Sequence, residues 1–144
     1  MTVSPTERAR RSADAMWASD RASKWAGFDR VSVAPGTAEL ALDVVPHHCN
    51  GHGICHGGVI FMLADSAFAF ACNSYNEIVV AQHCTISFVA PGKSGDRLSA
   101  TAAEISRTGR SGIYDVTVRN AKGATIAVFR GSSRVIDGRH FDED

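Results

Sequence analysis

The segment from residue 57 to residue 73 constrains the fold of this chain more than any other feature. It reads GGVIFMLADSAFAFACN, is apolar almost throughout, lacks proline and carries one acid, Asp65, near its middle. Alanine, leucine, methionine and phenylalanine are good to adequate helix formers. A helix that is apolar nearly all round is buried on most of its sides. The segment therefore predicts a central helix around which the rest of the chain folds.

The flanking sequence predicts one further helix and six strands. Ser4-Pro5-Thr6-Glu7 has the form of a capping box with proline at the first helical position, so a helix should run from there towards Lys24 and stop at Gly27. Residues 46–56 hold a proline and glycines without periodicity, and should form an irregular loop. Alternating or β-branched residues indicate strands at 31–33, 37–45, 79–89, 98–106, 113–120 and 124–136.

This order of elements indicates an α+β fold. The links between the last four strands are short, which favours antiparallel neighbours. One helix, two strands, a buried helix and four strands predict a single antiparallel sheet packed on a central helix. The 144 residues suit a single domain. We expect a helical segment at 1–28 packed on a main domain at 29–137, followed by a tail at 138–144.

Composition and charge narrow the classes of partner. Fifteen basic residues balance fifteen acidic ones, which gives no reason to expect nucleic acid or a membrane surface as a partner. The longest apolar stretch, 59–72, is shorter than the ~18 to 20 residues of a membrane span. The N-terminus lacks a signal-peptide pattern, so we expect a cytoplasmic protein. In a reducing compartment the cysteines should be free thiols; they are Cys49, Cys55, Cys72 and Cys84.

Asp65 is the first candidate for a functional residue. Burial of a carboxylate without partners costs several kcal/mol or forces its protonation. The residues three and four positions away are apolar, namely Phe61, Met62, Phe68 and Ala69. A purely structural interpretation stays open, in which Asp65 caps a second helix or lies at a rim that water reaches. An acid in apolar surroundings equally marks a candidate catalytic group.

The start of the central helix, His56-Gly57-Gly58, is the second candidate. The glycines allow close approach to the backbone, and the first-turn N–H groups have no acceptor within the helix, which suits an anion or a developing oxyanion. A double glycine is also common in a plain turn. Eight residues separate Gly57 from Asp65, about 12 Å along a helix. If both serve one reaction, two antiparallel copies of the helix must lie together, which predicts a homodimer with its active sites at the interface.

Several motifs share their spacing with a known family. They are Asn50-Gly51-His52-Gly53, His56-Gly57-Gly58, Leu63-Ala64-Asp65, residues 67–74, Gly95-Asp96-Arg97-Leu98, Gly112-Ile113-Tyr114-Asp115-Val116 and Phe129-Arg130-Gly131-Ser132-Ser133-Arg134. With these motifs, residues 35–136 closely resemble the hotdog-fold acyl-CoA thioesterases of the phenylacetate-degradation type. The resemblance implies a sheet wrapped around a long central helix, and dimers that often form tetramers.

The resemblance also implies an activity, the hydrolysis of a thioester between coenzyme A and an aryl-acyl or medium-chain acyl group. Coenzyme A is then part of the substrate, and no separate cofactor is expected. Asp65 corresponds to the catalytic carboxylate, as general base or nucleophile, and Gly57 to the N–H that polarises the thioester carbonyl. Asn50 and His56 correspond to polar residues around the reacting centre. A helix N-terminus stabilises the oxyanion of such a reaction.

Basic residues offer candidate contacts for the phosphates of coenzyme A. Positive charge and N–H groups occur in the loop 107–112 and near its preceding strand. A solvated hairpin turn is an equally open interpretation of this loop. The candidate residues are Arg107, Gly109, Arg110, Ser111 and Lys93.

Other chemistries fit the sequence less well. The tract 47–56 offers imidazoles and thiols, but its spacing matches no common zinc site, and we expect no metal. Adjacent Cys55 and His56 rarely point at each other, which argues against a nucleophile pair. A hydratase or dehydratase of the same fold would place an Asp and His pair before the central helix, where this chain has no acid between Val44 and Asp65. The last alternative is a non-catalytic acyl-CoA binding module. Such a module would tolerate loss of Asp65, which this chain retains.

Overall fold

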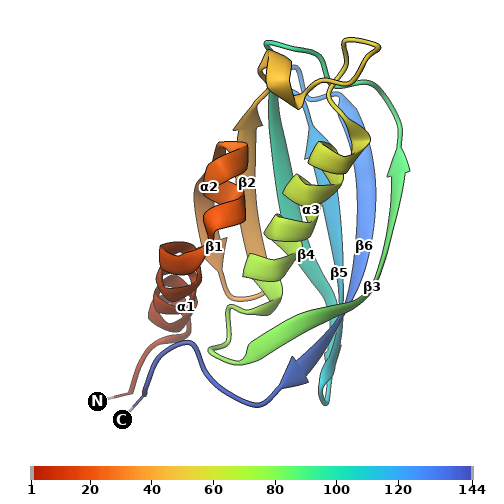
Figure 1. The fold of residues 1–144 in the computed structure, drawn as a ribbon. Helices are drawn as coiled ribbons and strands as arrows, with labels where there is room; N and C mark the ends of the chain where they lie inside the picture. The colour runs from red at the N-terminus through yellow and green to blue at the C-terminus, as the bar shows by residue number, and fades with distance from the viewer. Residues whose placement is uncertain (1, 144) are drawn as a thin grey trace.

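A long helix lies across one face of a single antiparallel sheet. The structure, a computed structural model, describes residues 2–143. Helix α3 (Gly57–Cys72) crosses the six-stranded sheet, whose strand order is β1-β2-β4-β5-β6-β3 (Figure 1). The strands are β1 (Phe28–Ala34), β2 (Thr37–Asp43), β3 (Ile78–Phe88), β4 (Arg97–Thr108), β5 (Ser111–Arg119) and β6 (Thr125–Ile136). The predicted α+β fold with one antiparallel sheet is confirmed.

The core forms where α3 meets the sheet. Leu63, Ala67 and Phe68 of α3 are buried, at 1% exposure or less. The Phe68 ring centroid lies 5.7 Å from that of Tyr114 on β5 and 5.8 Å from that of Phe129 on β6. Burial of side chains of this size contributes about 1.5 to 3 kcal/mol each. This packing fixes the position of α3 against β5 and β6.

The N-terminal segment forms two helices where the sequence predicts one. They are α1 (Pro5–Ser19) and α2 (Arg21–Ala26). The chain breaks at Asp20, whose carboxylate accepts hydrogen bonds from Ser23 N (2.9 Å) and Oγ (2.7 Å) and thus caps the second helix. The prediction of one continuous helix was wrong because this capping acid looks like an ordinary helix residue in the sequence. The start at Pro5 and the stop at Gly27, with φ of 83°, are confirmed.

Both ends of the chain pack on the main domain. Trp17 of α1 contacts Phe70 of α3, with 6.0 Å between the ring centroids. The C-terminal tail returns to α1, where the Arg11 guanidinium lies 4.2 Å from the Phe141 ring centroid and Arg8 pairs with Glu143 at 2.6 Å. Figure 1 shows the start of α1 and the C-terminal tail close together. Residues 2–28 and 138–143 therefore pack on the sheet domain.

Loops gather at the two ends of the sheet. A short 3-10 helix, η1 (Pro46–His48), the loop before α3 and the link between β3 and β4 lie at one end, while the β4–β5 hairpin lies at the other (Figure 1). Strand β3 forms one edge of the sheet. Within residues 2–143, no helix is long and apolar enough to span a membrane.

Candidate active site

The first turn of α3 leaves one backbone N–H without an acceptor. His56 caps the helix: its Nδ1 accepts from Gly58 N at 2.8 Å, and its carbonyl oxygen accepts from Val59 N at 2.9 Å and Ile60 N at 3.2 Å. In the described part of the chain, no protein group accepts a hydrogen bond from Gly57 N. This N–H carries the partial positive charge of the helix N-terminus. It is therefore the donor that the first turn offers to a ligand.

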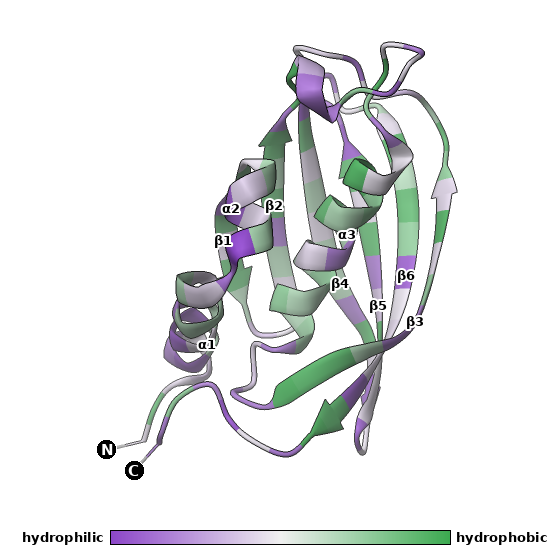
Figure 2. Ribbon diagram, viewed as in Figure 1, coloured by the Kyte–Doolittle hydropathy of each residue, from purple (hydrophilic) through white to green (hydrophobic). Residues whose placement is uncertain are grey.

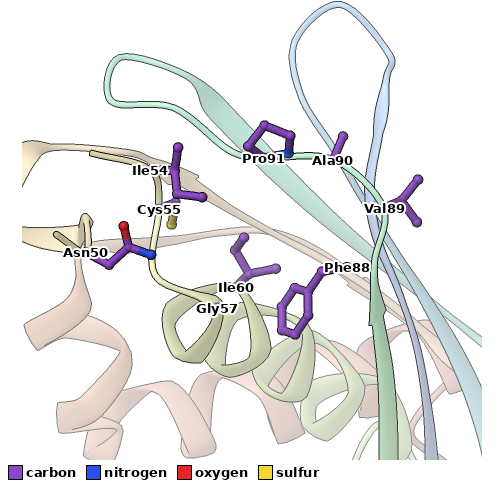
Figure 3. A pocket seen from close by; sticks show the side chains of 9 residues that line it. All are labelled: Asn50, Ile54, Cys55, Gly57, Ile60, Phe88, Val89, Ala90 and Pro91. Atoms are coloured by element: carbon purple, nitrogen blue, oxygen red, sulfur yellow. The ribbon is translucent and has the colours of Figure 1, made fainter. Parts of the chain in front are cut away.

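Gly57 lies at the wall of an apolar pocket of about 430 Å³. Figure 3 shows the pocket between the loop before α3 and the end of β3. The Phe88 ring covers Gly57 so closely that a Cβ on Gly57 would lie 3.1 Å from Phe88 Cζ. The lining residues are Asn50, Ile54, Cys55, Gly57, Ile60, Phe88, Val89, Ala90 and Pro91. An apolar acyl group with its carbonyl near Gly57 N fits such a wall.

Asn50 stands on the loop above this pocket. Its Oδ1 accepts from the backbone N–H of His52 at 2.9 Å, and its own N–H donates to Ile54 O at 2.9 Å. The side chain is thus fixed by its own loop and lines the pocket together with Gly57 (Figure 3). The structure brings three predicted site residues together here, since His56 caps the same helix start.

Asp65 is half-buried in the middle of a continuous helix. Because α3 runs unbroken from Gly57 to Cys72, Asp65 does not cap a second helix. Burial raises the pKa of its carboxyl above the usual value. Cys84 of β3 lies beside it, with its Sγ 4.0 Å from Oδ1. A carboxylate with raised basicity, held next to a weak donor, is suited to take a proton or attack a carbonyl.

One chain does not bring Asp65 and Gly57 into contact. Eight residues of the same helix separate them, about 12 Å along its axis. Asp65 is also absent from the lining of the pocket at Gly57. A single thioester therefore cannot touch both groups within one chain.

The candidate phosphate contacts fall into two places. Lys93 is exposed and pairs with Ile54, a lining residue of the pocket, in an isolated antiparallel bridge. The hairpin with Gly109, Arg110 and Ser111 follows β4, which spans about 36 Å from end to end. These two groups cannot hold the same phosphate within one chain.

Arg107 already has partners within the chain. Its guanidinium pairs with Glu77 at 2.7 Å and lies 3.7 Å from the ring centroid of Tyr75. An exposed pair of this kind contributes at most about 1 kcal/mol, so a phosphate can compete for the guanidinium. The remaining cation of the hairpin, Arg110, is exposed.

Two residues near the site are not among the site residues that the sequence predicts. Cys84 and Phe88 lie four positions apart on β3, and strand alternation puts both on the face that meets α3. The alternation was visible in the sequence, but the position of β3 against α3 was not. Across residues 2–143, no three His, Cys, Asp or Glu side chains gather as a metal site.

Comparison with known proteins identifies the family. Residues 52–127 match the Thioesterase superfamily. The chain is 42% identical over 133 residues to the acyl-coenzyme A thioesterase PaaI of Escherichia coli, covering 92% of this chain and 95% of that protein.

Solved structures agree with this match. That of the E. coli PaaI protein from the phenylacetic acid degradation operon superimposes with a TM-score of 0.92, covering 94% of this chain and 99% of that one. A Streptococcus mutans protein bound to acetyl CoA superimposes with a TM-score of 0.75 at 28% identity, covering 78% of this chain and 91% of that one. The chain therefore belongs to the thioesterase superfamily, among the hotdog-fold acyl-CoA thioesterases of the phenylacetate-degradation type.

Proposed function

We propose that this enzyme hydrolyses an aryl-acyl, phenylacetyl-type or medium-chain acyl-CoA to the free acid and coenzyme A. The observation that carries the proposal is the N–H of Gly57, for which residues 2–143 provide no acceptor, at the wall of an apolar pocket. The walls near it are formed by Ile54, Ile60 and Phe88, which suit a flat or aliphatic acyl group. The acetyl CoA bound to the S. mutans protein supports a substrate of this class.

Gly57 and Asp65 divide the chemistry between them. The N–H of Gly57 donates to the thioester oxygen and stabilises the negative charge that develops on it, an effect worth about 3 to 4 kcal/mol per donor. Asp65 either takes a proton from the water that attacks the carbonyl carbon, after which the C–S bond breaks and coenzyme A leaves as its thiolate, or attacks the carbonyl carbon itself and expels the same thiolate. The second route leaves an anhydride on Asp65, which water hydrolyses to the free acid. Burial raises the pKa of Asp65, which makes its carboxylate both a better proton acceptor and a better nucleophile, so the proposal keeps both routes. Asn50 and His56 hold the carbonyl and the helix start in position.

A homodimer completes the site in this proposal. Cys84 lies beside Asp65 and Phe88 beside Gly57. The distance along β3 from Cys84 to Phe88, four residues or about 13 Å, therefore matches the distance along α3 from Asp65 back to Gly57, eight residues or about 12 Å. A two-fold axis that crosses β3 near Ile86 brings Gly57 of one subunit level with Asp65 of the other.

The free edge of β3 supports this choice of interface. It carries exposed apolar residues, among them Val80 at 43% and Phe88 at 54% exposure. Figure 2 shows that the beginning of β3 is strongly apolar. Long apolar edge strands are normally covered, because they otherwise pair with other chains. We further propose that two such dimers form a homotetramer, as the resemblance implies.

Lys93 is the proposed phosphate contact on the subunit that supplies Gly57. It comes two residues after Pro91 of the pocket wall, and a second hollow beside it is lined by Lys93, Arg97 and Lys122 together with Asp96. The phosphate contacts proposed for the β4–β5 hairpin require the hairpin of another subunit, because the hairpin and the pocket at Gly57 of the same chain lie at opposite ends of β4. The hairpin residues are Arg107, Gly109, Arg110 and Ser111.

Hydrolysis is tested with a panel of acyl-CoA thioesters and a thiol reagent. The native protein should release free coenzyme A, with phenylacetyl-CoA among the good substrates. Asp65→Asn should lower kcat by orders of magnitude while the circular dichroism spectrum is retained. Equal thiol release by both proteins would contradict the role of Asp65. Binding without release by either protein would contradict hydrolysis.

Subunit complementation tests the shared site. Asp65→Asn removes the carboxylate, and Gly57→Val fills the pocket next to Phe88. Each variant alone should be nearly inactive. Dimers that contain one subunit of each kind should regain activity, because one of their two sites has an intact Gly57 and an intact Asp65. A mixed dimer without activity would show that both groups act within one chain. Light scattering measures the dimer and tetramer masses.

A further inference from the structure

Cys49 and Cys55 lie opposite each other on either side of the loop that carries Asn50. They form an isolated antiparallel pair. A hydrogen bond flanks the pair on each side, from Asn50 N to Ile54 O at 2.9 Å and from His56 N to His48 O at 2.8 Å. The pair itself therefore occupies a non-hydrogen-bonded position, where opposed Cα atoms are about 4.5 Å apart.

This position meets the requirements of a disulfide bond. Disulfides join residues whose Cα atoms are about 4.4 to 6.8 Å apart. Both thiols are free in the structure and make only weak contacts, from Cys49 Sγ to Val45 O at 3.8 Å and from Cys55 Sγ to His56 O at 3.9 Å. Side-chain rotation can release both sulfur atoms from these contacts without breaking the flanking backbone hydrogen bonds.

We propose that Cys49 and Cys55 are a reversible oxidation site, and that a disulfide between them controls the loop that carries Asn50 and leads to Gly57. Cys49 is half-buried and reachable, whereas Cys55 is buried. The order of reaction follows from this difference, with Cys49 reacting first and Cys55 second. Burial raises the pKa of the Cys55 thiol to about 11, with a smaller contribution from Cys49, so its thiolate is scarce at neutral pH.

The oxidant in this proposal is a peroxide. The Cys49 thiolate attacks one peroxide oxygen, the O–O bond breaks, and the other oxygen leaves as water after protonation, so that Cys49 becomes a sulfenic acid. The Cys55 sulfur then loses its proton, attacks the Cys49 sulfur and expels the sulfenic oxygen as a second water. In total, two thiols lose two electrons and two protons, and one peroxide is reduced to two waters. A small thiol reverses the step by exchange.

The disulfide would change the pocket as well as the loop. Cys55 lines the pocket together with Asn50 and Gly57 (Figure 3). When its sulfur turns to Cys49, the pocket wall changes and the short ring from 49 to 55 restrains Asn50. We expect oxidation to lower turnover severalfold. This effect on turnover rests on the proposed function, whereas formation of the bond does not.

Peroxide treatment followed by peptide mapping tests the bond directly. The native protein is oxidised with hydrogen peroxide, denatured, alkylated and cut with chymotrypsin, which cleaves after Phe61 and separates the pair from Cys72 and Cys84. The peptide with Cys49 and Cys55 should be unalkylated and lighter by two hydrogen atoms, and dithiothreitol should restore alkylation. Cys72 and Cys84 serve as internal controls, since burial raises the pKa of both thiols. Alkylation of both Cys49 and Cys55 after peroxide, or a bond to another cysteine, overturns the proposal.

A matched variant connects the bond with turnover. Cys49→Ser should keep the activity of the reduced protein and lose the sensitivity to peroxide, while the double variant Cys72→Ser/Cys84→Ser should still form the bond. A disulfide that leaves turnover unchanged would overturn control of the site. If the bond forms in a protein without thioesterase activity, the proposed function fails and the oxidation site stands.

Discussion

The Cys84 thiol lies 4.0 Å from Asp65 Oδ1. Within residues 2–143, no other polar side chain contacts this carboxylate. A thiol is a weak donor, so it stabilises the ionised carboxylate less than a hydroxyl would. Burial, in contrast, raises the pKa of Asp65. The contact connects the edge strand β3 with the middle of α3, where the proposed chemistry takes place.

Substitution of Cys84 should move the acid limb of the pH profile. A raised Asp65 pKa means that kcat/KM falls with decreasing pH at a higher pH than an ordinary aspartate, whose pKa is 3.8, would give. In Cys84→Ser a stronger donor stands beside the carboxylate, and once the side chains move to bring the hydroxyl within hydrogen-bond distance it should shift the limb to lower pH, whereas Cys84→Ala should shift it to higher pH. Thr85→Ala, on the opposite face of β3, is the control and should leave the profile unchanged. A limb that stays in place in both Cys84 variants would contradict the contact.

Asp65→Asn should stabilise the protein above the folded-state pKa of Asp65. The unfolded chain releases the Asp65 proton more readily than the folded protein, because burial raises the folded-state pKa. The free energy of unfolding of the native protein therefore falls as pH rises through the interval between the two pKa values. The free energy of unfolding of the asparagine variant does not fall in this way, because asparagine does not titrate. The variant should therefore be more stable than the native protein above the two pKa values and lose this difference below both of them. Urea titrations across this range measure the difference, and a variant without any advantage at neutral pH would contradict it.

The central helix and the order of the strands were predictable because each depends on a local pattern. The segment 57–73 is apolar nearly all round, and the strands alternate between short polar links. The break at Asp20 was not predictable, because the sequence does not distinguish an aspartate that caps a helix from an aspartate that is exposed to solvent within one. The positions of Cys84 and Phe88 beside Asp65 and Gly57 depend on the register of β3 against α3, which tertiary packing sets.

Gly57→Ala should impair catalysis through Phe88. The added Cβ would lie 3.1 Å from Phe88 Cζ, so the ring has to move and the pocket narrows next to the N–H donor. We expect kcat/KM to fall roughly tenfold, about 1.4 kcal/mol in transition-state binding. In Phe88→Ala, which has no ring next to Gly57, the added Gly57→Ala substitution should lower kcat/KM less than it does in the native protein. Steady-state kinetics of the two single variants and the double variant measure this difference. Strictly additive losses would argue against the contact as the cause.

Lys93→Ala should weaken binding of coenzyme A thioesters without affecting the chemical step. An exposed cation beside a phosphate contributes about 1 kcal/mol, so KM should rise about fivefold. A thioester of N-acetylcysteamine lacks the phosphates and should show no change in KM. Arg110→Ala, at the other end of β4, tests the hairpin on the same two substrates. Equal effects of Lys93→Ala on both substrates would exclude a phosphate contact.

Gly131→Ala should destabilise the core beneath α3. A Cβ at this position on β6 would lie 2.7 Å from Cζ of the Phe68 ring, closer than van der Waals contact permits. Phe68 is buried between Tyr114 and Phe129, so its ring has little room to move. Overpacking of this kind costs about 1 to 3 kcal/mol. Urea titration should show this loss, and Gly131→Ala/Phe68→Leu should lose less than the sum of the two single variants, because a leucine leaves room for the added methyl group.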